Sequence, residues 1–131
     1  MALSKADLLK RASRTYIVVE DVRIQSLTEL ERTALEGLFA KRLQELREAD
    51  VEAQLKAIHR NHCELLIWTL VDDDNVRMFE MGEESVAQVG SMRPDLFGKL
   101  YTAARKHVGF GNDDKEVDDN LKKSSETQDS N

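Results

Sequence analysis

Residues 16–26 form the first ordered pattern of apolar and polar positions along the chain. Three consecutive β-branched residues at 17–19 precede an alternation of apolar and polar side chains over 22–25. This pattern is typical of a β-strand with one solvated face. Glu20 and Asp21 separate the two halves. The segment is therefore predicted as either two short strands joined by a turn or one bent strand.

A helix is predicted to begin at Thr28. The phrase Thr28-Glu29-Leu30-Glu31 is a capping box, in which the threonine hydroxyl and the second glutamate satisfy free amides of the first turn. An apolar stripe beside charged positions follows, at Leu30, Ala34, Leu35, Leu38 and Leu43. Gly37 weakens this helix by roughly 1 kcal/mol relative to alanine, so we expect it to mark a close contact. The polar stretch 44–50 interrupts the pattern.

The second helix, from Val51 to about residue 70, has the clearest periodicity. Its stripe comprises Val51, Leu55, Ile58, His62, Leu65 and Thr69. Leu66, Ile67 and Leu70 widen the stripe toward the C-terminus. We therefore expect the C-terminal end of this helix to be the more buried end.

A turn and two more helices follow. Residues 72–75, DDDN, favour a turn, so a small hairpin or a tight reversal is predicted around them. A short helix is expected over 83–90, with Gly90 placed as its C-terminal cap. Pro94 suits the first turn of a last helix, which Gly109 and Gly111 should end. Its apolar side comprises Leu96, Leu100, Ala103, Ala104 and His107, with Phe97 and Tyr101 adjacent.

The two ends of the chain differ from this middle part. Residues 1–14 are basic and faintly amphipathic, which indicates a flexible N-terminal arm or a frayed helix. Residues 112–131 contain two large aliphatic side chains, too few to offset the entropy cost of ordering, so we expect a disordered acidic tail. Between them, residues 15–111 are predicted to be a single globular domain. The predicted class is α+β, mainly α-helical, with a short N-terminal β element and about four helices.

Composition and charge narrow the function classes. The chain has 131 residues, which suits one domain, and 34% of them are charged, above the usual quarter. Residues 1–60 carry 11 Lys/Arg against 10 Asp/Glu, whereas residues 61–131 carry 8 against 15. An acidic half argues against nucleic acid and against an anionic membrane surface as partners.

Cellular location is indicated by cysteine usage and by the absence of leader patterns. Cys63 is the single cysteine, so an internal disulfide is impossible and a reducing compartment is expected. No apolar run is long enough to span a membrane, and no signal-peptide pattern opens the chain. Asp7 and the lack of a serine-rich stretch count against a transit peptide.

Two clusters could bind metal ions. His59, His62 and Cys63 would share one helical face, but no HExxH order and no second cysteine or histidine cluster accompanies them. We interpret His62, which lies in the apolar stripe, as a hydrogen-bonded core histidine. Residues 72–75 do not form a calcium loop, because the sixth position is Arg77 where an EF-hand has glycine. We therefore expect no metal and no cofactor.

No catalytic pattern is present. The sequence lacks GxSxG, a papain-like surround for Cys63 and a phosphate-binding GK[ST] loop. Glu83 and Glu84 are interpreted as first-turn helix residues. We expect a protein that binds other proteins and is not an enzyme. Its amphipathic helices either present a groove to a partner helix or bury every apolar stripe in the protein's own core.

Several phrases between residues 15 and 110 follow the order and spacing of one known family. Short β segments and a threonine-initiated helix lie at 16–24 and 28–31. LVDDDNVRMF at 70–79 is similar to the family phrase LVDEDGNxLF, and VAQVG at 86–90 is similar to VxxLG. AARKHVGF at 103–110 is similar to AAxxxNGL. Residues 15–110 thus resemble the tail assembly chaperones of long-tailed bacteriophages.

The sequence departs from the family pattern at three places. Asn75 replaces a frequent glycine while keeping the left-handed conformation accessible. Val108 replaces an asparagine, and Met81-Gly82 replaces an acidic pair. The match in order and spacing carries the resemblance, because each phrase alone is short.

The resemblance implies a role. Such chaperones bind the long helical tape measure protein in the host cytoplasm, keep it soluble and promote tail tube assembly around it. They are absent from the mature virion, they tend to form homo-oligomers, and many have a longer frameshifted form. The family has no catalytic residues, and the resemblance does not identify partner-binding residues. The alternative is another small phage structural or protein-interaction module, such as a head–tail component.

Overall fold

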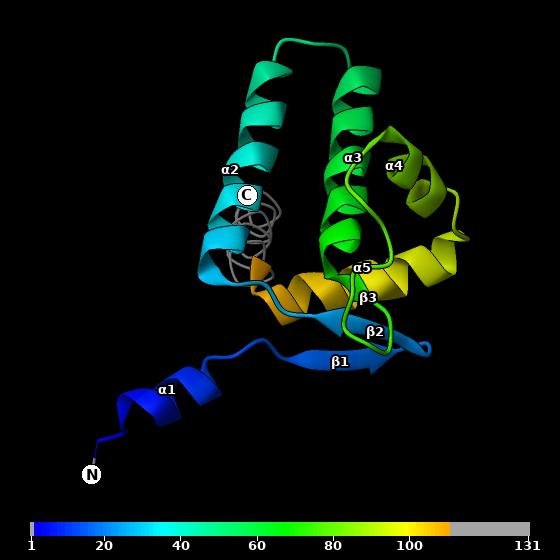
Figure 1. Cartoon of the computed structure of the whole chain (residues 1–131). Coiled ribbons are helices and arrows are strands. Elements are labelled where there is room, and N and C mark those ends of the chain that lie inside the picture. Colours follow the sequence, from blue (N-terminus) through cyan, green and yellow to red (C-terminus); the bar gives the residue numbers. More distant parts are fainter. Residues whose placement is uncertain (1, 111–131) are drawn as a thin grey trace, which may run out of the picture.

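The computed structural model describes residues 2–110, which form an α+β fold that is mainly helical, as predicted (Figure 1). In chain order the elements are α1 (Lys5–Arg11), β1 (Tyr16–Val19), β2 (Val22–Gln25), α2 (Glu29–Glu45), α3 (Val51–Thr69), β3 (Leu70–Val71), α4 (Glu83–Gly90) and α5 (Pro94–Val108). The predicted tail, residues 112–131, lies outside the described residues, as does Gly111.

The N-terminal β segment is two strands joined by a turn. β1 and β2 pair antiparallel, with Tyr16 opposite Gln25 and Val19 opposite Val22. Glu20 and Asp21 both have positive φ, at 51° and 61°. Two consecutive left-handed residues give the tight hairpin turn whose twist matches that of the strands.

β3 completes a three-stranded sheet in the order β1-β2-β3. It pairs antiparallel with β2, placing Leu70 opposite Ile24. The chain then reverses at residues 72–75, and Val71 forms a bridge with Arg77. Asn75 has φ 64°, the left-handed conformation expected at such a turn. The predicted reversal is confirmed.

Helices α2 and α3 form an antiparallel hairpin that projects from the rest of the molecule (Figure 1). The capping box is formed as predicted, because Thr28 Oγ1 accepts from the Glu31 amide and Glu31 accepts from the Thr28 amide. Asp50 caps α3. Gln54 Nε2 donates to three carbonyl groups in the loop, those of Leu46, Arg47 and Ala49.

The core lies at the base of this hairpin, between α3, α4, α5 and the sheet. It contains Ile24, Cys63, Leu65, Leu66, Ile67, Leu70, Val89, Leu100, Ala104 and Val108. Burial of each large aliphatic side chain here stabilises the fold by about 1.5–3 kcal/mol. The C-terminal end of α3 is thus the buried end, as the widened stripe predicted.

The sequence left open whether the apolar stripe of α2 is covered. Of this stripe only Leu35 is buried, and Leu30 is 82% exposed. Two sequence expectations, about Gly37 and Gly90, were wrong. A Cβ at Gly37 would meet nothing within 4 Å, so this glycine marks no close contact. Gly90 is the last residue of α4, and Ser91 is the cap. A Cβ at Gly90 would lie 2.8 Å from His59 Nε2, so the glycine permits close packing of α4 on α3.

The N-terminal arm contains a regular helix. Ser4 caps α1 by accepting from the Asp7 amide, and Lys10 and Arg11 lie in its last turn. None of its residues is buried. The arm is tied to the body just after the helix, where Arg14 contacts Glu31 and the Ser26 carbonyl group.

Candidate protein-interaction site

The heptad-spaced stripe of α3 is divided between the core and the surface. Its positions alternate at four- and three-residue spacing, which is the geometry of a coiled-coil seam. Leu65 and Thr69, at one end, are buried. Val51 and Leu55, at the other end, are 68% and 59% exposed. We call Val51, Leu55 and Ile58, with Leu43 of α2, the open seam.

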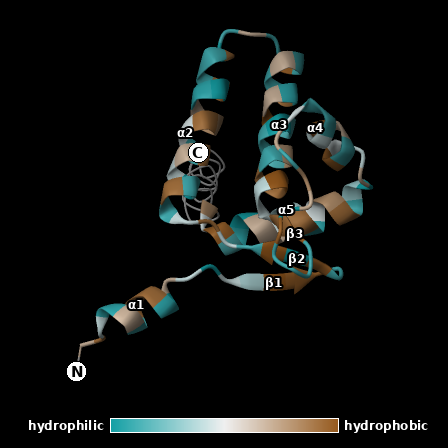
Figure 2. Cartoon of the chain, viewed as in Figure 1, coloured by the Kyte–Doolittle hydropathy of each residue, from teal (hydrophilic) through white to brown (hydrophobic). Residues whose placement is uncertain are grey.

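The open seam leads into a groove between α2 and α3. The groove has a volume of about 410 Å³ and is lined by Glu36, Phe39, Leu43, Ile58, Asn61, His62, Leu65, Tyr101 and Phe110. α5 crosses beneath the hairpin (Figure 1), and its Tyr101 lines the base of the groove. Apolar residues, interspersed with hydrophilic ones, extend along both helices above this base (Figure 2).

Aromatic contacts close the base of the groove. The rings of His62 and Tyr101 stack with their centroids 4.1 Å apart. Phe39 and Phe110 meet edge to face at 6.3 Å. These contacts hold α2 and α5 against α3, so the groove is formed before any ligand arrives. A preformed apolar groove between helices suits the apolar face of a partner helix.

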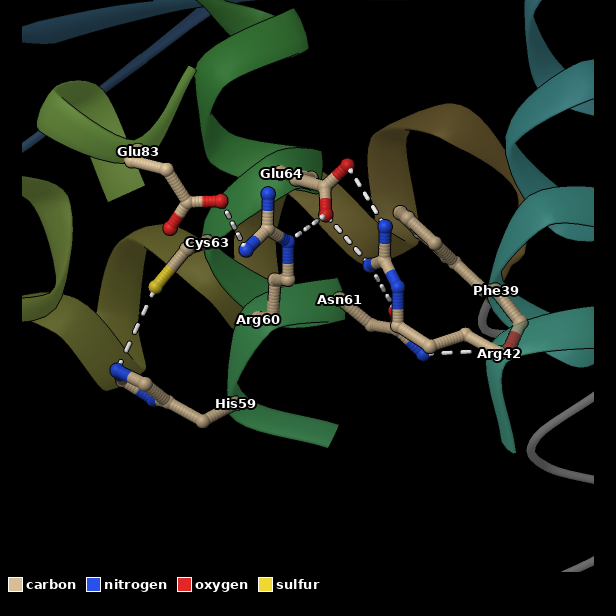
Figure 3. Close-up of polar contacts among 8 residues, drawn as sticks. All are labelled: Phe39, Arg42, His59, Arg60, Asn61, Cys63, Glu64 and Glu83. Carbon is tan, nitrogen blue, oxygen red and sulfur yellow. Dashed lines mark hydrogen bonds and ion pairs between the residues drawn. The ribbon is translucent and has the colours of Figure 1, made fainter. Parts of the chain in front are cut away.

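The buried carboxylate of Glu64 joins α3 to α2 (Figure 3). Glu64 has a side chain only 2% exposed and pairs with Arg42 of α2 and Arg60 of α3. Arg42 Nη1 also donates to Asn61 Oδ1 at 2.6 Å. Asn61 in turn donates to the Phe39 carbonyl group. A carboxylate removed from water is tolerated only with such partners.

The same carboxylate cluster reaches α4 through Arg60, which also pairs with Glu83 (Figure 3). The carboxylates of Glu83 and Glu64 raise the pKa of the Arg60 guanidinium, so it stays charged. Three helices therefore share one set of ion pairs. These ion pairs join α2 to α3 and α3 to the first turn of α4.

The predicted metal candidates divide into two groups. His59 Nε2 lies 3.5 Å from Cys63 Sγ, on the α4 side of α3. His62 faces the groove instead, stacked on Tyr101. Within residues 2–110 no three histidine, cysteine or acidic side chains are grouped as a metal site. His62 is half-buried, so the interpretation as a core histidine holds only in part.

Cys63 is held in the thiol form. Burial raises the pKa of its thiol, and the neighbouring Glu64 carboxylate raises it further. Nucleophilic cysteines need the opposite environment, one that stabilises the thiolate. The position of Cys63 in the core cluster gives it a packing role.

The acidic turn at residues 72–75 is stabilised by hydrogen bonds between the Asp72 side chain and backbone amides of the same segment. Asp72 Oδ1 accepts hydrogen bonds from the amides of Asp74 and Val76. Asp73 and Asp74 are exposed. This is an Asx-type turn, which gives Asp72 a structural role.

Sequence reasoning missed the Glu64 cluster. One signal was present, because Arg60 and Glu64 are four residues apart on one helix. The pairing with Arg42 joins residues 22 positions apart and depends on how α2 packs on α3.

Comparisons with protein-family models, curated protein sequences and solved structures find no match to this chain. Among the described residues, no helix is both long enough and apolar enough to cross a membrane.

Proposed function

We propose that this chain is a phage tail assembly chaperone that binds helical segments of the tape measure protein in the α2–α3 groove. The observation that carries the proposal is the open seam, a heptad-spaced apolar stripe that continues beyond the core with no partner among the described residues. The family resemblance supplies the identity of the partner. The groove supplies a physical way to bind it.

The chemistry of the groove suits an amphipathic helix. Such a ligand places apolar anchors at i, i+3, i+4 and i+7, and the open seam offers matching positions on α3. A long tape measure protein exposes many such faces, which aggregate unless they are covered. One groove binds weakly, but many copies along one chain bind strongly through multivalency. Each contact can still be released when the tail tube assembles.

Charge favours the same role. The chain carries a formal net charge of −6. A coat of like-charged copies keeps a covered apolar polypeptide in solution. The function requires no bond-making step, and the proposal assigns none.

The proposal is tested by co-expression with the tape measure protein of the same genome. Soluble tape measure protein is measured with and without this chain, and co-purification is scored by a tag on the tape measure protein. We expect solubility to depend on this chain and the two proteins to elute together.

A matched pair of variants locates the binding face. Leu55 and Val76 are both 59% exposed, but only Leu55 belongs to the open seam. Leu55→Asp should abolish co-purification, whereas Val76→Asp should preserve it. If the tape measure protein is equally soluble without this chain, the chaperone function is rejected, and a stable component of the finished particle becomes the better hypothesis.

A further inference from the structure

A second unpartnered apolar element lies at the other end of the molecule. In α1, Leu8 and Leu9 are 55% and 59% exposed, although the helix is capped and regular. α1 extends away from the body on the side opposite the tip of the α2–α3 hairpin (Figure 1). A short helix with exposed leucines gains stability by docking on an apolar surface.

The charges of α1 and of the hairpin tip are complementary. α1 carries Lys5, Lys10 and Arg11 against Asp7, a net charge of +2. No ion pair among residues 2–110 involves these three cations. The hairpin tip, residues 44–56, carries four acidic residues against two basic ones, a net charge of −2. Val51 and Leu55 of the open seam lie within this acidic tip, and Leu43 and Ile58 lie next to it.

In the structure α1 does not lie on the groove of its own chain. Arg14 is paired with Glu31, near the start of α2. From this anchor α1 extends away from the α2–α3 hairpin (Figure 1). The open seam is left uncovered by its own α1, and Val51 at its far end is 68% exposed. We therefore take the acceptor for α1 to be another molecule.

We propose that α1 of one copy docks in the α2–α3 groove of a second copy, head to tail. Leu8 and Leu9 cover the open seam, and Lys5, Lys10 and Arg11 lie beside the acidic tip. Because donor and acceptor are different surfaces, each copy can bind two neighbours, and the contact forms rings or open chains.

This contact concerns the groove that the proposed function assigns to the tape measure protein, but it does not depend on that function. It would cover the groove until a tape measure helix displaces α1. It can be measured with the purified full-length protein alone, so its failure and the failure of the chaperone proposal are separable.

The test uses sedimentation equilibrium of the full chain and three variants. The arm variant carries Leu8→Asp and Leu9→Asp, the groove variant carries Leu55→Asp, and Val76→Asp is the control with equal exposure. The wild type and the control should increase in mass with concentration. The arm and groove variants, each alone, should remain monomers.

Mixing the variants gives the decisive result. In an equimolar mixture of the arm and groove variants, the groove variant supplies an intact α1 and the arm variant supplies an intact groove. Dimers should therefore form, and nothing larger. A monomeric mixture overturns the proposal, as does a monomeric wild type. If the groove variant is monomeric while the arm variant associates normally, the contact is groove to groove and the proposal is wrong. Circular dichroism checks that the variants are folded, and Val51→Asp replaces Leu55→Asp if the latter is not.

Discussion

At the scale of single residues, Glu64 is a charged side chain in the same buried environment as its neighbours on α3. It lies on α3 among Cys63, Leu65 and Leu66, all of them buried, and it is itself only 2% exposed. A carboxylate in such a place is stabilised only by its partners, here Arg42 and Arg60. The energetic consequence of losing it is therefore large.

Glu64→Gln should lower the free energy of unfolding by about 3 kcal/mol, because Arg42 is left in a mostly buried site without its counter-charge. Urea denaturation measures this change. Glu52→Gln is the control, since the exposed pair of Glu52 with Lys56 contributes at most about 0.5 kcal/mol. Equal losses in the two variants would show that Glu64 is not a buried partner.

Leu66 tests the position of the core. It is fully buried, whereas Leu30 of α2 is 82% exposed. Leu66→Ala should destabilise the protein by about 2–5 kcal/mol, because a cavity forms in a packed interior. Leu30→Ala should change stability by no more than about 0.5 kcal/mol. Thermal and urea unfolding of both variants, compared with the wild type, measures the difference.

At the scale of elements, the start of α2 is also the attachment point of the arm. Glu31 closes the capping box with Thr28 and pairs with Arg14, which contacts the Ser26 carbonyl group. Thr15 extends the attachment to α5 through a contact between its hydroxyl group and His107 Nε2. One carboxylate thus joins the helix cap to the segment that carries α1.

The ion pair and hydrogen bonds of Glu31 should make the stability of the protein depend on pH. Burial alone would raise the pKa of Glu31, but the Thr28 amide and Arg14 lower it below the ordinary value of 4.5. The charged form is therefore favoured in the folded protein, and its contribution is complete above pH 4.5 and lost as pH falls through the folded-state pKa.

The variant Glu31→Gln should be less stable than the wild type at pH 7, and the difference should shrink as pH falls below 4.5. Unfolding free energies at several pH values measure this. Arg14→Gln should reduce the same pH-dependent part of the curve. A difference that stays constant down to acid pH would contradict the assigned ion pair.

At the scale of the whole molecule, the buried core lies apart from the exposed elements that we propose bind other molecules. The core lies at the base of the α2–α3 hairpin, while α1 contributes no buried residue. Removal of residues 1–13 should therefore leave the melting temperature within about 2 °C of the full chain, since the stability change is below about 0.5 kcal/mol. Arg14 remains in the shortened chain and can still pair with Glu31 of the capping box. Differential scanning calorimetry measures this, and a large fall would place α1 in the core.

Local patterns determined most of the elements. The capping box at Thr28, the long period of α3, the acidic turn before Arg77 and Pro94 at the start of α5 all depend on residues close in sequence. Such signals act through backbone hydrogen bonds and φ/ψ preferences, so the chain carries them without its tertiary partners. The same signals left one bent strand or two strands open at residues 16–26, and the positive φ of Glu20 and Asp21 decides for two.

Tertiary structure decided which apolar faces are covered. Both α2 and α3 carry an apolar stripe in sequence, yet Leu35 and Leu65 are buried while Leu30 and Leu55 are exposed. Periodicity shows that a helix face is apolar. Only the path of α5 beneath the hairpin shows which part of that face is packed against other elements and which part is exposed. The sequence analysis missed the role of Glu64 and misread that of Gly90, because the environments of these residues come from Arg42 and His59 on other helices. The sequence by itself thus determined the helices and turns, and the packing of distant segments determined the groove.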